Sequence, residues 1–359
     1  MRTNVYVMYG GQSPEHDVSL KSALAVINRL DRERYRVFPI YIDPEGRWRG
    51  GDELIGEVEH SHNIRFSVDE AAPMSGILKQ WYNEDRGSHV VFPVLHGPNG
   101  EDGTLQGMLD MLNVPYVGNG VFASAAGMDK IMTKRLMEQA GIPQAPYMAI
   151  NSFEWNENEE AIIREIEESI GYPCFVKPAS MGSSIGINRC ENRLQLAHAV
   201  QDAFRYDRKI AVEQEIDGRE IQLAILGWNE LFCSEAGEFE RERNFFSYER
   251  KYGSGKLTMR IPARLDEGVY IRLRTMALRA FRTLDGAGLM RVDFFVTDDN
   301  VIYLNEVNTL PGFTENSMFP AMLTFDGQRT FEGLLDELIE FAFQRYQAKQ
   351  IWFEGRVEA

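Results

Sequence analysis

The sequence predicts an α/β protein of two or three domains, and three observations lead to this fold class. The chain has 359 residues, which is more than one hydrophobic core usually spans. Its first third alternates short apolar runs with segments of helical periodicity, which is typical of β-α-β units with parallel strands. Near the C-terminus, two runs rich in β-branched and aromatic residues flank a turn-forming cluster, which predicts an antiparallel hairpin.

The first unit opens with a short alternating strand that ends at Gly10 and Gly11. A later apolar strand runs into His96 and a glycine-rich turn. The segment 43–88 shows no clear period, and we assign no order of elements to it. The elements expected here are strands at 4–9, 36–42 and 89–95 and helices at about 18–30 and 104–112.

The second unit begins at Asp129, which has the residue type of an N-cap for a helix ending at Ala140, with Gly141 as its stop signal. The segment 238–255 is long, charged and aromatic without a period, which is typical of a functional loop. The remaining elements expected are helices at about 157–170, 192–206 and 329–347, strands at 173–177, 210–214, 220–227 and 230–234, and the hairpin at 289–308.

Composition excludes several classes of function. The net charge of −16, without a basic block to offset it, argues against nucleic acid or an anionic membrane as the partner. The three cysteines are odd in number and have no metal-binding spacing, so we expect buried thiols in a reducing compartment. The N-terminus lacks a signal-peptide core, and no apolar run approaches the ~20 residues of a membrane span. We therefore expect a soluble, cytoplasmic protein.

The C-terminal hairpin carries the strongest chemical signal. If its turn is centred near residues 299–300, Asp293 falls opposite Glu306, and alternation puts Arg291 and Asn308 on the same surface. Carboxylates about 5 Å apart on paired strands repel each other unless a cation lies between them. Oxygen-only ligands suit Mg²⁺ or Mn²⁺ better than zinc. Taken alone, the pattern fits solvated acids on an edge hairpin equally well.

Two other segments could contact a nucleotide. Lys177 ends a strand and is followed by a loop in which Gly182 permits close backbone approach and Ser183 and Ser184 offer hydroxyl donors, although a plain turn is the commoner explanation of such a loop. The segment from Glu213 to Glu220 places carboxylates around a strand end and a turn, where they could accept from an adenine amine and a ribose. Surface acids at a turn are the simpler alternative.

Three further residues are candidates because of their positions. His96 follows a strand at the carboxyl edge of a parallel sheet, where ligands bind, although a structural histidine is about equally common in such a turn. Glu15 lies near a helix N-terminus, where an acid is also favoured by the helix dipole alone. In the loop 238–255, Lys251 could close over a phosphorylated substrate, although a solvated charged tip is the default.

Taken together, these segments resemble the D-alanine–D-alanine ligases of the ATP-grasp superfamily. The resemblance spans nearly the whole chain, in the family's order. It is carried by residues 10–19, 95–107, 128–130, 175–186, 248–252, 291–293 and 304–314.

The resemblance implies a three-domain ATP-grasp enzyme with a Rossmann-like N-terminal domain at 1–127, a central domain at 128–217 and a C-terminal domain at 218–359. It implies ATP and two Mg²⁺ or Mn²⁺ ions. By position, nucleotide contacts would come from Lys130, Lys177, Ser183, Ser184, Glu213 (adenine), Glu220 (ribose) and Lys251, and the metals would be held by Asp293, Glu306 and Asn308. Substrate and oxyanion contacts would come from Glu15, His96, Ser183, Arg291, the amide of Gly312, Ser317 and Tyr252.

The reaction implied is the joining of two D-alanines through an acyl phosphate, for peptidoglycan precursors, by a cytoplasmic homodimer. In this family a tyrosine at position 252 goes with D-alanine as the acceptor, but Ser247 and Arg250 depart from the commoner loop sequence. D-alanine–D-lactate and D-alanine–D-serine ligases are therefore alternatives within the class. A catalytically silent nucleotide-binding regulator is the alternative outside it, disfavoured because the metal ligands, lysines and Arg291 are all present.

Overall fold

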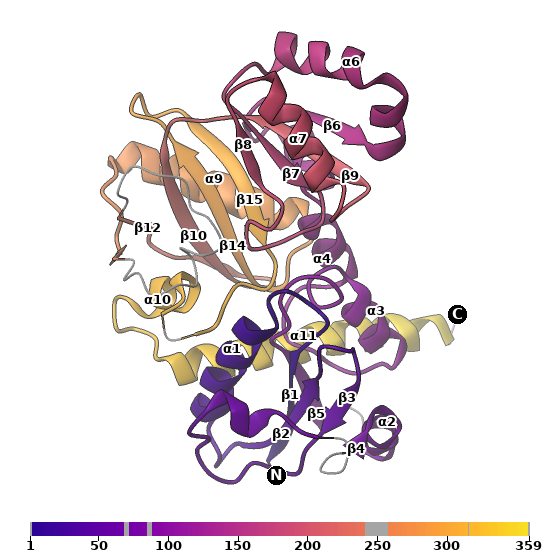
Figure 1. Ribbon diagram of the computed structural model, residues 1–359. Helices are drawn as coiled ribbons and strands as arrows, with labels where there is room; N and C mark the ends of the chain where they lie inside the picture. Colours follow the sequence, from indigo (N-terminus) through magenta and orange to yellow (C-terminus); the bar gives the residue numbers. More distant parts are fainter. Residues whose placement is uncertain (1, 68–71, 85–87, 241–257, 315, 358–359) are drawn as a thin grey trace.

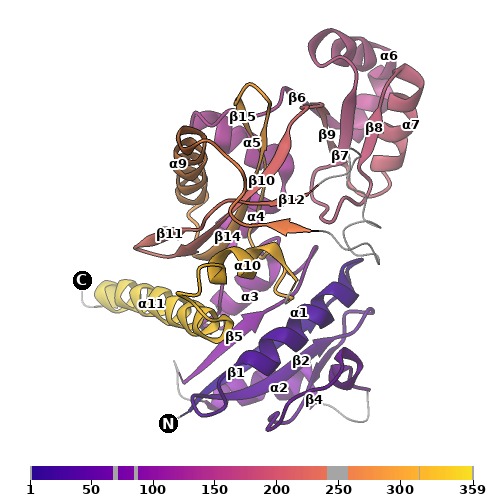
Figure 2. The ribbon, with the colours of Figure 1, turned by 90° about the vertical axis from the view of Figure 1, so that its left-hand side faces the viewer.

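The computed structural model describes residues 2–67, 72–84, 88–240, 258–314 and 316–357, and every structural statement below refers to these. They form three β-sheets that follow one another along the chain, of five, four and six strands. The five-stranded and four-stranded sheets lie at opposite ends of the molecule, with the six-stranded sheet between them (Figures 1 and 2). The α/β class predicted from the sequence is confirmed.

The first sheet is built around β1 (Thr3–Gly10), which pairs in parallel with both β2 (Tyr35–Ile42) and β5 (His89–Pro93). β1 is buried from Val5 onward, as expected for a parallel strand covered on both faces. The carboxyl ends of β1 and β5 therefore share one edge, where parallel sheets bind ligands. The other elements of this unit are α1 (His16–Arg29), β3 (Trp48–Gly50), η1 (Ser61–Ile64), β4 (Ala72–Pro73), α2 (Met74–Asn83) and α3 (Thr104–Met111).

The four-stranded sheet is antiparallel throughout, in the order β6-β9-β7-β8. Two helices lead into it, and Asp129 caps the second of them by accepting from the N–H groups of Ile131 and Met132 (3.0 and 3.1 Å), as predicted. The elements are α4 (Val121–Met128), α5 (Lys130–Gln139), β6 (Tyr147–Asn151), α6 (Ser152–Ser169), β7 (Cys174–Pro178), β8 (Asn188–Cys190), α7 (Arg193–Ala203) and β9 (Lys209–Gln214).

The six-stranded sheet carries the predicted hairpin at one edge. Its order is β13-β12-β10-β14-β15, with β11 paired to β10, and helix α9 (Glu267–Thr283) packs against it. The strands are β10 (Arg219–Gly227), β11 (Leu231–Cys233), β12 (Gly237–Phe239), β13 (Met259–Arg260), β14 (Gly288–Val296) and β15 (Ile302–Asn308).

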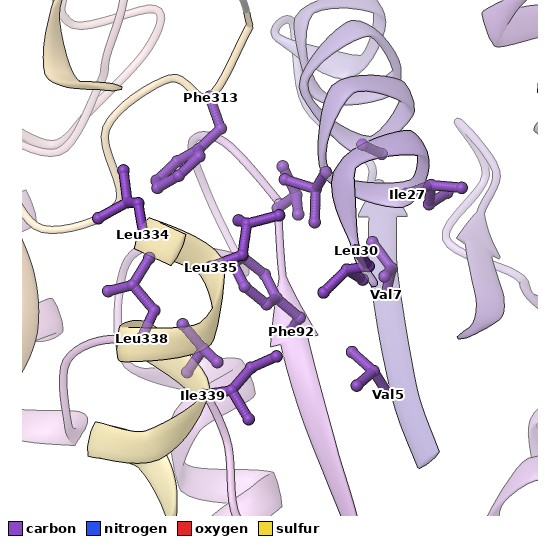
Figure 3. Packing of buried hydrophobic residues seen from close by; sticks show 14 of the residues in the cluster. Val5, Val7, Ile27, Leu30, Phe92, Phe313, Leu334, Leu335, Leu338 and Ile339 are labelled. Carbon is purple, nitrogen blue, oxygen red and sulfur yellow. The ribbon is translucent and has the colours of Figure 1, made fainter. Parts of the chain in front are cut away.

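The last helix, α11 (Phe331–Val357), returns to the first sheet. Its residues Leu334, Leu335 and Leu338 share one buried core with β1 and α1, and Figure 3 shows Leu335 beside Phe92 of β5. Phe313, from the segment between β15 and α10 (Met318–Thr324), joins this core with its ring centroid 6.2 Å from that of Phe92. This apolar contact fixes the segment after β15 against the N-terminal unit. The domain boundaries at 127/128 and 217/218 stay a prediction.

The structure also contains elements that the sequence reasoning did not assign. They are β3, η1, β4 and α2 in the stretch 43–88, and α4, β6, β8, β12, β13, α9 and α10 elsewhere. α4 reads Val-Phe-Ala-Ser-Ala-Ala-Gly-Met and has almost no polar face, so it shows no helical period. α9 did carry a signal, because its buried residues Val269, Leu273, Ala277 and Ala280 recur at three- and four-residue spacing.

Candidate active site

A cleft of about 740 Å³ lies where the three sheets meet. It gathers side chains from segments almost 300 residues apart in the sequence. Lys177, Ser184, Glu213 and Asp293 are absent from its lining, and Lys251 and Tyr252 fall outside the described residues. Ten residues singled out from the sequence line the cleft: Glu15, His96, Lys130, Ser183, Glu220, Arg291, Glu306, Asn308, Gly312 and Ser317.

The hairpin of β14 and β15 has the predicted register. Asp293 pairs with Glu306 and Arg291 with Asn308, and the turn lies at residues 297–301. One bulge follows, because Phe294 pairs with Leu304 and leaves Asn305 as the extra residue. Arg291, Glu306 and Asn308 therefore face the cleft together.

Asp293 lies beneath this surface with no solvent exposure. Arg291 donates to it twice, from Nε (2.8 Å) and Nη2 (2.7 Å), and the amide of Asn308 donates from 3.2 Å. Burial raises the pKa of Asp293, Arg291 lowers it, and the charges of Glu306 and Glu220 raise it again, to about 6. Negative charge is therefore crowded here beyond what one guanidinium neutralises.

The residues present fit a hard divalent cation. Glu306 and Asn308 offer oxygen ligands at the cleft and Asp293 offers a carboxylate directly beneath them, a donor set that suits Mg²⁺ or Mn²⁺, and a cation would offset the negative charge of the carboxylates. Among the described residues, no three His, Cys, Asp or Glu side chains gather into a metal-binding group. The amide oxygen of Asn308 would have to supply a third ligand beside the carboxylates of Asp293 and Glu306.

A second cluster joins the first sheet to the loop after β7. The Ser183 hydroxyl donates to the Glu15 carboxylate, although Ser183 has to adopt a left-handed backbone (φ 50°) to do so. His96 lies beside Glu101, with 3.7 Å between Nδ1 and Oε1, and its Nε2 lies 3.3 Å from the hydroxyl of Ser22. Five polar side chains from three distant segments thus meet at the mouth of the parallel sheet.

The charges in this cluster are coupled. Burial and the neighbouring Glu101 raise the pKa of Glu15, against the opposing effects of His96, Ser183 and Lys130. Burial lowers the pKa of His96, but Glu101 and Glu15 outweigh it and the net shift is upward. His96 is therefore biased toward the imidazolium form. A cationic ligand group would be favoured next to Glu15 for the same electrostatic reason.

The segment after β15 closes the far side of the cleft. Ser22 on α1 accepts from the N–H of Phe313 (3.4 Å), which holds the segment against the first unit. The hydroxyl of Ser317 accepts from the N–H of Thr314 (3.0 Å) and lies 2.8 Å from the hydroxyl of Thr314. Gly312 faces Ser317, where an added Cβ would lie 3.1 Å from its hydroxyl oxygen. Gly312, Thr314 and Ser317 of this segment line the cleft.

Comparison with known proteins assigns these features to one family. Two family descriptions, "D-ala D-ala ligase N-terminus" and "D-ala D-ala ligase C-terminus", match residues 4–119 and 136–340. The chain belongs to the D-alanine–D-alanine ligase family. It is 48% identical over 360 residues to the D-alanine–D-alanine ligase of Geobacillus thermodenitrificans, covering 98% of each chain. The family resemblance read from the sequence, and the enzyme class it implied, are confirmed.

Solved structures agree on the fold. The D-alanine–D-alanine ligase of Coxiella burnetii is similar with a TM-score of 0.81 and 32% identity, covering 100% of this chain and 99% of that one. The VanG D-Ala:D-Ser ligase of Enterococcus faecalis is equally similar, with a TM-score of 0.82 and 34% identity over 95% of this chain and 100% of that one. Fold likeness alone therefore does not separate two acceptor substrates.

Within this ligase, Lys130 and Lys177 lie on two sides of the loop 179–187. Lys130, the first residue of α5, donates to the carbonyl of Met181 (2.6 Å). Lys177, near the end of β7, donates to Glu213 (2.9 Å) and to the side-chain oxygen of Asn305 (3.4 Å). Lys177 thus spans from the four-stranded sheet to the bulge beside Glu306, although it is not part of the cleft lining.

Gly182 allows the loop to approach Glu15, and this closeness can be tested. A Cβ at residue 182 would lie 2.9 Å from Glu15 Oε2, so Gly182→Ala has to displace that carboxylate. We expect kcat/KM for D-alanine to fall roughly 10- to 100-fold with little change in Tm, because catalysis is sensitive to small misplacements. Gly56→Ala is the matched control, since no atom lies within 4 Å of its added Cβ. Unchanged kinetics in Gly182→Ala would contradict the close approach of Gly182 to Glu15.

Glu213 should make stability depend on pH in the acid range. Burial raises its pKa, but Lys134 and Lys177 outweigh burial and hold the pKa at about 2, below the usual 4.5. The stabilisation is complete above pH 4.5 and is lost as pH falls towards 2, at most about 3 kcal/mol. Urea titrations should therefore give a lower free energy of unfolding for Glu213→Gln than for the wild type at pH 7, and this difference should shrink below pH 4.5. If the difference did not depend on pH, or if the exposed Glu159→Gln showed the same difference, the predicted charge interaction of Glu213 would be contradicted.

Several residues at the site escaped the sequence reasoning. Val18 and Lys21 line the cleft from α1, at three-residue steps from Glu15, so helical spacing could have identified them. Glu101 lies within the glycine-rich turn after His96, and its position in the sequence predicted no role for it. Lys134, one turn after Lys130, gave no separate signal, because a lysine in a helix is usually solvated. The side chain is buried instead, 2% exposed.

Proposed function

We propose that this protein joins two molecules of D-alanine into D-alanyl-D-alanine and converts ATP to ADP and phosphate in the same reaction. One observation supports this more than any other: a single cleft gathers the Glu15–Ser183 pair, the Arg291–Glu306 hairpin surface and the Gly312–Ser317 segment. These groups suit, in turn, an ammonium, a phosphoryl group and a carboxylate. The relative at 48% identity carries the same activity in its name.

The first D-alanine is bound through its ammonium by Glu15. Glu15 is buried and takes one hydrogen bond from Ser183, so an ammonium supplies the opposite charge that the site favours. His96, biased toward its charged form, lies next to Glu15 and suits the carboxylate end of a substrate. The donor is thereby oriented with its carboxylate toward the nucleotide.

The first chemical step transfers a phosphoryl group. The carboxylate of the bound D-alanine attacks the γ-phosphorus of ATP, which gives an acyl phosphate and ADP. Lys130, Lys177 and the hydroxyls of Ser183 and Ser184 are proposed to bind the phosphates, with Lys251 from the loop 238–255. Glu213 and Glu220 are proposed to accept from the adenine and the ribose.

Two divalent ions are part of the proposal. Asp293, Glu306 and Asn308 would hold Mg²⁺ or Mn²⁺, which when bound would neutralise the charge of the transferring phosphoryl group. The chain's own task at this hairpin is to hold the carboxylates in place. The bidentate contact from Arg291 to Asp293 and the β14–β15 register do this.

The second step forms the peptide bond. The amine of the second D-alanine attacks the carbonyl carbon of the acyl phosphate, and phosphate leaves as the tetrahedral intermediate collapses. Arg291 uses Nε and Nη2 on Asp293, so Nη1 is its nitrogen suited to the oxyanion, together with the N–H of Gly312. Ser317 is proposed to bind the carboxylate of the acceptor, with Tyr252 completing the acceptor site.

A second candidate function is ligation of D-alanine to D-serine or D-lactate. It is favoured by the similarity to the VanG D-Ala:D-Ser ligase, at 34% identity. The residue expected to discriminate, Tyr252, lies outside the described residues. Sequence alone supports the D-alanine acceptor here.

A competition assay tests both functions. The purified protein is incubated with ATP, Mg²⁺ and an equimolar mixture of D-alanine, D-lactate and D-serine, and the products are identified by mass. D-alanyl-D-alanine as the dominant product, dependent on ATP and absent with L-alanine, is the expected result. A depsipeptide or a mixed dipeptide would select the second candidate. The absence of any product and of ADP would contradict both.

The working form is proposed to be a cytoplasmic homodimer. Within the described residues, no helix is both long and apolar enough for a bilayer span. The free thiols of Cys174, Cys190 and Cys233 are compatible with a reducing compartment. Exposed Met111 and Phe122, on the adjacent helices α3 and α4, are apolar side chains that a second copy could cover. One chain has a mass of 41.1 kDa, and light scattering should give twice this value.

A further inference from the structure

Two lysines share one buried carboxylate behind the loop 179–187. Glu213 Oε2 lies 2.9 Å from Nζ of Lys177 and 3.4 Å from Nζ of Lys134. The side chains of Lys134 and Glu213 are 2% and 4% exposed, and that of Lys177 is 12% exposed. Lys134 has been assigned no role so far, although burying a lysine is costly unless its charge is compensated.

The fold holds Lys134 in place from three directions. Its ammonium lies 5.2 Å from the ring centroid of Tyr147, and Tyr147 is the direct cross-strand neighbour of Glu213 on β6 and β9. Its backbone carbonyl accepts from the side chain of Gln144 (2.7 Å). Lys134 is therefore fixed on the inner side of Glu213, and Lys177 lies on the side that reaches Asn305 at the cleft.

The arrangement has an electrostatic consequence. One carboxylate and two ammonium groups leave the cluster with a net charge of +1. With Lys177 alone, Glu213 would neutralise its partner completely, and a phosphate would have to compete with a buried ion pair. With Lys134 present, Glu213 is shared between two ammonium groups, and the three charges sum to +1 beside Lys177, the more exposed of the two lysines.

We propose that Lys134 is a positioning residue for nucleotide binding: by sharing Glu213, it leaves the Glu213–Lys177 pair in a cluster with the net positive charge that a nucleotide phosphate needs. This rests on the proposed function, in which Lys177 contacts the phosphates of ATP. Lys134 does not touch the substrate. It acts on ATP affinity only through Glu213 and Lys177.

A double-mutant cycle tests the proposal. Lys134→Met keeps the length of the side chain but removes its charge, so Glu213 pairs with Lys177 alone. We expect Kd for ADP with Mg²⁺, measured by calorimetry, and KM for ATP to rise about 10-fold, with KM for D-alanine unchanged. Lys134→Met combined with Glu213→Gln restores the net charge of +1 and keeps an oxygen acceptor. Because Glu213 is also the proposed adenine contact, the reference is Glu213→Gln alone: the double variant should bind ADP within about threefold of Glu213→Gln and more tightly than Lys134→Met. Lys134→Arg, which keeps the charge, should bind ADP like the wild type.

A purely structural Lys134 gives a different result. Lys134→Met would then lower Tm with KM for ATP unchanged, and the double variant would bind ADP no better than the single one; either outcome overturns the proposal. Lys79→Met, an exposed lysine on α2, controls for the loss of one positive charge. Failure of the proposed function would be distinct, because the wild type itself would then form no dipeptide. If Lys177→Met bound ADP like the wild type, the proposal would be contradicted, because it requires Lys177 to contact the nucleotide phosphates.

Discussion

Replacing Asp293 with asparagine is expected to lower kcat by at least about 10³-fold, equivalent to ~4 kcal/mol. Asn keeps the size of the side chain but removes the charge that the proposed metal ions need. It also leaves the buried guanidinium of Arg291 without its bidentate partner, which is bound at 2.8 and 2.7 Å in the native protein. Steady-state kinetics over a range of Mg²⁺ concentrations should show that high Mg²⁺ does not restore activity.

The matched control for this variant lies in the same hairpin. Asp298 is exposed in the turn between β14 and β15, and Asp298→Asn should keep activity within twofold of the wild type. Circular dichroism and ADP binding separate lost chemistry from lost folding, because ADP binding reports on a folded nucleotide site. Turnover by Asp293→Asn within threefold of the wild type would falsify the metal assignment.

Glu15→Gln is expected to lower kcat/KM for D-alanine by about 100-fold, or ~2.7 kcal/mol. The glutamine retains hydrogen bonding to Ser183 but no longer opposes the ammonium of the first substrate. Glu15 is buried, 6% exposed, so the lost charge interaction is poorly replaced by water. KM for ATP should change little. The result is measured as initial rates against D-alanine at saturating ATP.

The same residue predicts a pH effect. Because burial and Glu101 raise the pKa of Glu15 above its usual 4.5, the carboxylate that binds the ammonium is lost at a higher pH than for an ordinary glutamate. Activity with D-alanine should therefore fall as pH drops through that raised pKa, and this acid limb should be absent in Glu15→Gln. Asp17 is an exposed acid in the first turn of α1, and Asp17→Asn should keep both the wild-type rate and the loss of activity at acid pH. If Glu15→Gln lost activity over the same acid pH range as the wild type, the titrating group would be a residue other than Glu15.

Local chemistry could be read from the order of residues. The pairing of Asp293 with Glu306 followed from alternation along two strands and a turn at 299–300, and the structure has that register. The cap at Asp129 and the parallel first sheet followed in the same way from side-chain type and period. The hairpin and the cap depend on neighbours within about twenty residues, and the parallel sheet followed from the alternation of strands and helices, so these signals lie in contiguous stretches of the chain.

Contacts between distant segments could not be read in this way. Ser183 and Glu15 are 168 residues apart, and their hydrogen bond depends on how the loop after β7 lies over the parallel sheet. Residues in α11 complete the core of the first unit, although the sequence placed that helix in the third. The burial of Lys134 was equally hidden, because a lysine has the same local pattern whether water or Glu213 compensates its charge. Packing between units settles which side chains lose water, and the loss of water makes an otherwise ordinary charge part of the site.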